Sequence, residues 1–104
     1  MNQGSIVLVP FPFSDISSQK QRPALVISKK NKWGDVIVVA ISSKKHSPAV
    51  QINTKDLEEG ELPIISYVRY DKIVTLHESL VRKVVATVNT STLKDILKKV
   101  KALF

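Results

Sequence analysis

The feature that most constrains the fold is an unbroken apolar run at residues 36–41, Val-Ile-Val-Val-Ala-Ile, near the middle of the chain. The run does not alternate with polar residues, so it predicts a central strand that is buried on both faces. It is far shorter than the roughly 20 apolar residues that a membrane-spanning helix needs. The rest of the chain must therefore supply neighbouring strands and covering layers.

Short apolar runs bounded by turn residues predict further strands at 5–9, 23–28, 49–53, 63–69, 72–76 and 81–88. The lysine-rich segment 29–34 is a plausible hairpin connection, and a tight turn is predicted at residues 70–71. Residues 54–60 have the pattern of a helical turn, in which Thr54 serves as the N-cap and Gly60 as the left-handed C-cap.

The chain closes with one predicted helix. Apolar residues recur there with a period of 3.6, at Leu93, Ile96, Leu97, Val100, Leu103 and Phe104. Residues 90–92 are expected to cap this helix, and the lysines near its end complement its dipole. The predicted fold is mainly β with a C-terminal helix: a single domain over residues 1–104, built as a small SH3-like barrel of five to seven strands.

Composition excludes several kinds of site. The chain has no cysteine, which excludes disulfides, thiolate zinc sites and a cysteine nucleophile. Its two histidines, His46 and His77, are far apart in the sequence. We therefore expect no metal and no cofactor. The first residues also lack the basic and apolar regions of a signal peptide, so a cytoplasmic location without a membrane anchor is expected.

Net charge favours a polyanionic partner. Sixteen Lys and Arg residues against nine Asp and Glu residues give a formal charge of +7. A basic protein whose charge merely keeps it dispersed has the same composition, so charge alone does not decide between the two interpretations.

Arg22 is the first candidate for chemistry. Pro23 fixes its own backbone and pushes Arg22 into an extended conformation at the start of a strand. A guanidinium held there can grip a phosphate with two hydrogen bonds and stays charged at any working pH. An ion pair between Arg22 and a nearby carboxylate such as Asp15 is equally compatible with the local sequence.

Ser42 is the second candidate, because it follows the central strand directly. A hydroxyl at the end of a buried strand can donate a hydrogen bond to a phosphoryl oxygen, and Lys44 and Lys45 add positive potential. An ordinary polar loop is the alternative interpretation. His46 can exchange a proton near neutral pH, but a loop histidine before Ser-Pro is usually solvated, so it is left out of the catalytic set.

Other residues suggest contacts with nucleic acid. Trp33 with its neighbouring lysines combines an aromatic face with cations, although a Trp in a hairpin can equally cover a barrel end. Phe13 is a groove wall or a core residue. Lys20 and Asp15, from the long loop before Arg22, complete the candidate RNA-binding set with Phe13, Lys44, Lys45 and Trp33.

Four stretches together resemble the MazF/PemK family of toxin endoribonucleases. They are residues 4–15 (GSIVLVPFPFSD), 20–28 (KQRPALVIS), 38–42 (VVAIS) and 66–76 (SYVRYDKIVTL), and they occur in the family's order before the terminal helix. The resemblance covers nearly the whole chain. Its most specific part is the Lys-x-Arg-Pro-x-Leu-Val segment after a loop rich in Pro and Phe.

The resemblance implies an SH3-like barrel that acts as a homodimer and cuts single-stranded RNA at short sequences without a metal. It also implies an antitoxin partner, acidic and partly disordered, whose tail covers the RNA groove. The family's active-site Arg before Pro matches Arg22, and its Thr or Ser at the end of the third strand matches Ser42. Some relatives carry an acidic residue just before the Arg, whereas here Gln19-Lys20-Gln21 precedes it.

These parts suffice for transesterification, in which the RNA's own 2′-hydroxyl attacks the adjacent phosphorus. Arg22 would stabilise charge on the phosphoryl oxygens, and Ser42 would donate a second hydrogen bond. Three rival classes stay open at this point: a topoisomerase poison of the same fold, a non-catalytic RNA-binding module, and a degenerate toxin without activity.

Overall fold

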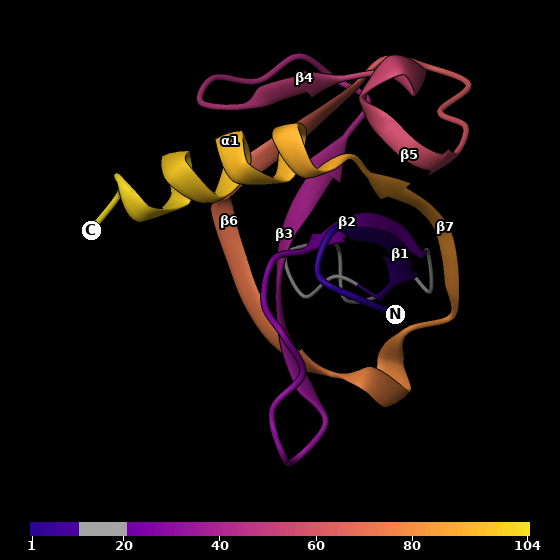
Figure 1. Ribbon diagram of the computed structural model, residues 1–104, viewed down its shortest axis with the longest axis vertical. Coiled ribbons are helices and arrows are strands. Elements are labelled where there is room, and N and C mark those ends of the chain that lie inside the picture. The colour runs from indigo at the N-terminus through magenta and orange to yellow at the C-terminus, as the bar shows by residue number, and fades with distance from the viewer. Residues whose placement is uncertain (11–20) are drawn as a thin grey trace.

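The computed structural model describes residues 1–10 and 21–104. In this part of the chain, seven antiparallel strands form one sheet that curls into a half-barrel, with one helix laid across it (Figure 1). The strands are β1 (Ser5–Val9), β2 (Arg22–Val26), β3 (Asp35–Ser42), β4 (Val50–Ile52), β5 (Leu57–Gly60), β6 (Ser66–His77) and β7 (Lys83–Val88), and the helix is α1 (Thr90–Lys101). The predicted mainly β fold with a C-terminal helix is confirmed.

The strand order is β4-β6-β3-β2-β1-β7-β5, which leaves β4 and β5 as the edges among the described strands. Register shifts interrupt the pairing of β1 with β7, of β3 with β6 and of β5 with β7. Such bulges bend the strands and increase their twist, which lets a small sheet curl around its own core.

Strand β3 is central, as the apolar run predicts. Val36 and Val38 belong to one buried cluster, while Val39 and Ile41 belong to another. Successive side chains point to opposite faces of a strand, so the two clusters mark the two faces of the sheet. Ile37 departs from the prediction, because 38% of its surface is exposed.

Helix α1 covers the face of the sheet that carries Val39 and Ile41. Ile96 and Val100 are buried against β-strand residues, and Leu93 and Leu97 pack beside them. The helix ends at Lys101, so Leu103 and Phe104 lie beyond it and are exposed. Their inclusion in the apolar stripe is therefore wrong. In the part of the chain that the structure describes, no helix is long and apolar enough to cross a membrane.

The predicted turn at residues 70–71 is wrong. Strand β6 runs without reversal from Ser66 to His77. Its register against β3 places Ile73 opposite Val39 and Arg69 opposite Ala40, so residues 70–72 form a bulge between them. The Tyr-Asp pair that suggested a turn thus bends one long strand instead of joining two short ones.

The predicted helical turn at residues 54–60 is correct only at its start. Residues 54–56 form a 3₁₀ turn whose N-cap is Asn53, and the following residues form β5, which pairs with β7. Gly60 does have a positive φ of 87°, but it lies in a strand. A Cβ atom there would lie 2.6 Å from the Val85 carbonyl oxygen, so close packing of two strands requires the glycine.

The cap of α1 gives a test of the fold. The Asn89 side-chain oxygen accepts a hydrogen bond of 2.8 Å from the Thr92 backbone N–H, so Asn89, and not residues 90–92, caps the helix. Asn89→Ala should destabilise the protein by about 1 kcal/mol and lower the melting temperature by about 5 °C. Thr90→Ala, the matched control at the next residue, should change it little. An equal fall for both variants in a thermal melt would contradict this assignment.

Candidate functional site

A pocket of about 840 Å³ opens where the start of β2, the end of β3 and the start of β6 meet. Loops before β4 and before β6 complete its wall. It is called the basic pocket below, because four cationic side chains and one carboxylate line it among residues 1–10 and 21–104. These are Arg22, Lys44, Arg69, Lys72 and Glu61.

The register of the sheet brings the two predicted catalytic residues to this pocket. Ala24 of β2 lies opposite Ala40 of β3 in an antiparallel pair. The same register, continued by two residues on each strand, places Arg22 opposite Ser42. Both residues line the basic pocket. Residues two apart on a strand share a face, so Arg22 and Ser42 lie on the same side of the sheet as Ala24 and Ala40.

Local sequence explains why Arg22 stands at the rim. Pro23 lacks a backbone N–H, and a proline is tolerated near the start of a strand where a ladder donor is not needed. Arg22 itself pairs with Val9 at the end of β1 and is exposed. The guanidinium thus belongs to the first residue of a strand whose last three residues, 24–26, are in the core.

Two polar groups contact the Ser42 hydroxyl. Its Oγ accepts a hydrogen bond of 3.0 Å from the Lys44 backbone N–H, and it lies 3.2 Å from His46 Nε2. The loop after β3 therefore folds back on the strand end. His46 also lines the basic pocket. The sequence interpretation left this histidine out as a solvated loop residue, and nothing in the local sequence indicates that the loop returns to Ser42.

Arg69 and Lys72 are pocket residues that sequence reasoning missed. Arg69 directly precedes the bulge in β6 and lies opposite Ala40 in the sheet, and Lys72 is the last residue of the bulge. The Arg69 Nε atom is buried and has no hydrogen-bond partner among the described residues; the Asp71 carboxylate lies 3.9 Å away. A buried N–H without a partner is costly, and an anion in the pocket is a suitable acceptor for it.

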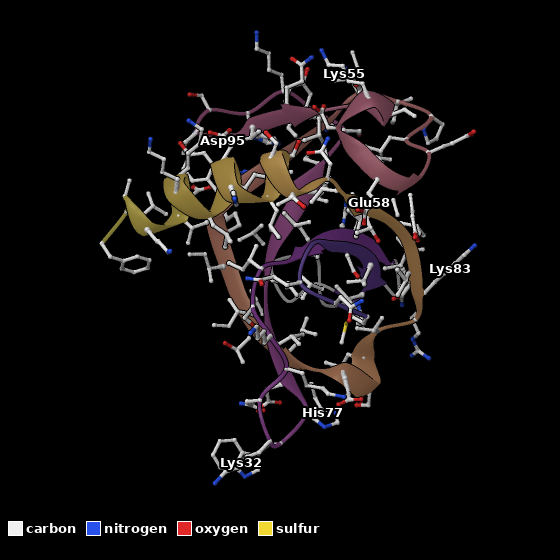
Figure 2. The ribbon with its side chains drawn as sticks, in the orientation of Figure 1. Lys32, Lys55, Glu58, His77, Lys83 and Asp95 are labelled. Atoms are coloured by element: carbon white, nitrogen blue, oxygen red, sulfur yellow. The ribbon has the colours of Figure 1, made fainter. Side chains whose placement is uncertain are left out.

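The remaining candidates divide into three groups. Lys44 lines the basic pocket, whereas Lys45 does not. Trp33 lies near the tip of the β2–β3 hairpin, 67% exposed, with the Lys32 ammonium 4.5 Å from its ring centre. Figure 2 shows Lys32 at this tip, at the opposite end of β3 from the strand end that carries Ser42. Phe13, Asp15 and Lys20 lie outside the described residues.

This arrangement suits the binding of phosphate groups. Guanidinium and ammonium groups hold phosphoryl oxygens by charge-assisted hydrogen bonds, and the Ser42 hydroxyl adds a neutral donor or acceptor. In the described part of the chain, no three His, Cys, Asp or Glu side chains gather where they could hold a metal ion. Among the described residues, the candidate site is therefore a cationic pocket in which the Ser42 hydroxyl and the His46 imidazole lie side by side.

Comparison with known proteins extends this description. Residues 2–104 match the family described as the PemK-like, MazF-like toxin of type II toxin-antitoxin systems. A comparison with curated proteins found no match.

Solved structures share the fold. An endoribonuclease in complex with its cognate antitoxin, from a mycobacterial species, superposes with a TM-score of 0.76 at 18% identity, covering 98% of this chain and 92% of that chain. MazE-MazF from Deinococcus radiodurans gives 0.72 at 19% identity over 99% and 93%. The Mycobacterium tuberculosis toxin MazF-mt6 gives 0.68 at 16% identity over 92% and 90%.

The family match spans nearly the whole chain, and the similar structures agree with the curled sheet and terminal helix seen here. The chain belongs to the PemK/MazF family of toxins of type II toxin-antitoxin systems.

Proposed function

We propose that this protein is a metal-independent endoribonuclease toxin that cleaves single-stranded RNA, including mRNA, at short sequence motifs. The observation that carries the proposal is the meeting of Arg22 and Ser42 in one cationic pocket. Two similar structures are named endoribonucleases, which supports the same activity here. The short cleavage motif rests on the resemblance to the family.

The proposed reaction is a transesterification within the RNA. The 2′-oxygen bonds to the adjacent phosphorus as its proton leaves, and the bond from phosphorus to the 5′-oxygen breaks as that oxygen gains a proton. The products are a 2′,3′-cyclic phosphate and a 5′-hydroxyl. Because the substrate supplies the nucleophile, the protein needs only to align the atoms and stabilise developing charge.

Arg22 is proposed as the main stabiliser of that charge. Its planar fork can donate to two phosphoryl oxygens at once, and a strand start fixes its backbone. Ser42 is proposed to donate a further hydrogen bond to the phosphoryl group. The other cations of the basic pocket are proposed to hold flanking phosphates; they are Lys44, Arg69 and Lys72.

We also propose that the toxin is a homodimer and that a cognate antitoxin, acidic and partly disordered, neutralises it. Large apolar side chains remain exposed on the described surface, and a second copy can cover some of them. They include Ile64, Ile65, Val84, Leu103 and Phe104. The antitoxin proposal is supported by similar structures that are complexes with antitoxins.

Arg22→Lys separates geometry from charge. An ammonium keeps the charge but loses the planar fork, so the single-turnover cleavage rate of a short RNA should fall at least about 100-fold, roughly 3 kcal/mol. Ser42→Ala should cost less, about ten-fold, as the loss of one neutral hydrogen bond. All assays contain excess EDTA, so that activity also tests metal independence.

Thermal melts provide the control for these variants. Arg22 is exposed, so Arg22→Lys should leave the melting temperature nearly unchanged. If Arg22→Lys cleaves RNA near the wild-type rate, Arg22 does not act through two simultaneous hydrogen bonds to the phosphate. If its melting temperature falls by a large amount, Arg22 has a structural role instead. The alternative function is that of a non-catalytic binding protein of the same fold, either a topoisomerase poison or an RNA-binding module. Wild-type protein that binds RNA without cutting it would favour this alternative.

Adjacent lysines test whether the basic pocket is the RNA site. Lys44 and Lys45 are neighbours of equal charge, but only Lys44 lines the pocket. Lys44→Ala should weaken binding of a non-cleavable single-stranded oligonucleotide about five-fold, near 1 kcal/mol, as expected for one charged phosphate contact. Lys45→Ala, the matched control, should have a smaller effect in the same fluorescence titration. The reverse order would place the RNA elsewhere.

Assembly is tested by light scattering at tens of micromolar protein. The toxin alone should show twice the 11.6 kDa mass of one chain. Added antitoxin should raise that mass and stop cleavage. A monomer at this concentration would contradict the proposed dimer.

A further inference from the structure

The contacts of one hydroxyl point to an additional residue of the proposed reaction. We infer that His46 is a positioning residue: it donates a hydrogen bond from Nε2 to Ser42 Oγ and thereby turns the Ser42 hydroxyl proton toward the RNA phosphate. The inference rests on the proposed endoribonuclease function and deepens it.

A serine hydroxyl has one proton to donate and two lone pairs that accept. One lone pair of Ser42 Oγ accepts the Lys44 backbone N–H at 3.0 Å. A backbone N–H cannot reverse its role, so this contact is always a donation to Ser42. In the second contact, Ser42 Oγ lies 3.2 Å from His46 Nε2. Either atom can be the donor, because the direction of this hydrogen bond depends on which ring nitrogen carries the hydrogen.

The two directions have opposite consequences for Ser42. If Nε2 is bare, it accepts the Ser42 proton, and the hydroxyl has nothing left to donate to a phosphate. If Nε2 carries a hydrogen, both lone pairs of Ser42 are occupied by N–H donors. Its own proton must then point away from both, toward another acceptor. An RNA phosphate in the basic pocket is such an acceptor, so bound RNA favours the second arrangement.

The surroundings of His46 are compatible with this role. The neutral ring with its hydrogen on Nε2 is already a donor, so the arrangement requires no positive imidazolium beside Arg22, Lys44 and the other pocket cations. The ring is half-buried, and its neighbours Lys44 and Lys45 are exposed. His46 thus occupies the wall of the basic pocket, with its ring edge at the hydroxyl that the proposed reaction uses.

The test measures single-turnover cleavage at saturating RNA, binding of a non-cleavable oligonucleotide, and thermal stability. His46→Ala should lower the cleavage rate about ten-fold while the dissociation constant changes less than about two-fold. His46→Gln should restore the rate to within about three-fold of wild type, because its amide N–H can donate to Ser42 Oγ but cannot act as a base. In the Ser42→Ala background, His46→Ala should change the rate less than about two-fold.

His77→Ala is the matched control. His77 also contacts a serine, with Nδ1 2.8 Å from Ser79 Oγ, but it lies near the far hairpin and does not line the basic pocket. Figure 2 shows its place beside that hairpin. This variant should cleave RNA at the wild-type rate. A rate loss equal to that of His46→Ala would show that the effect reports general loosening, and this would overturn the inference.

Each outcome has one meaning. Wild-type protein that fails to cleave RNA contradicts the proposed function itself. Active wild type with an equally active His46→Ala overturns the positioning role alone. If His46→Gln is as slow as His46→Ala, and the loss persists without the Ser42 hydroxyl, then His46 transfers a proton directly to or from the RNA, and the positioning role is wrong.

Discussion

Ala24 of β2 lies opposite Ala40 of β3, and this register decides which side chains meet at the end of the sheet. A slip of one residue would turn every side chain of a strand to the other face. Such a slip would move Leu25 out of one buried cluster and Ala24 and Val26 out of the other, so the packing of both clusters holds the register in place. The apolar side chains that stabilise the fold therefore also fix the relative positions of Arg22 and Ser42.

The same dependence extends to the third strand of the site. Arg69 reaches the basic pocket because it pairs with Ala40, directly beside the three-residue bulge of β6. Residues 70–72 form the bulge and have no partner in the pairing with β3. The residues before and after the bulge still pair with β3. Cationic side chains from separate strands and a loop thus converge on a small volume, whose lining contains one carboxylate among the described residues, that of Glu61. Their mutual repulsion is relieved when a polyanion binds, which couples the electrostatics of the site to its ligand.

Features of the fold and the site that depend on neighbouring residues in the sequence could be predicted, whereas those that depend on contacts between distant segments could not. The apolar run at 36–41 and the 3.6-residue period after residue 92 are local patterns, and both predicted their elements correctly. Arg22 and Ser42 were identifiable because each stands at the end of a strand that the sequence reveals. Arg69, Lys72 and His46 were not, since their place in the pocket depends on a bulge and on a loop that folds back. Lys45 and Trp33 show the converse, because nearby charge and aromaticity do not bring a side chain into the pocket.

If the basic pocket cuts RNA by means of the substrate's own 2′-hydroxyl, as proposed, the chemical groups at the ends of the products record it. Purified protein is incubated with a single-stranded RNA in excess EDTA, and the fragments are analysed by mass spectrometry. Attack by the 2′-hydroxyl should leave a 2′,3′-cyclic phosphate on one fragment and a 5′-hydroxyl on the other. Fragments that carry a 3′-hydroxyl and a 5′-phosphate, or the absence of cleavage, would contradict it.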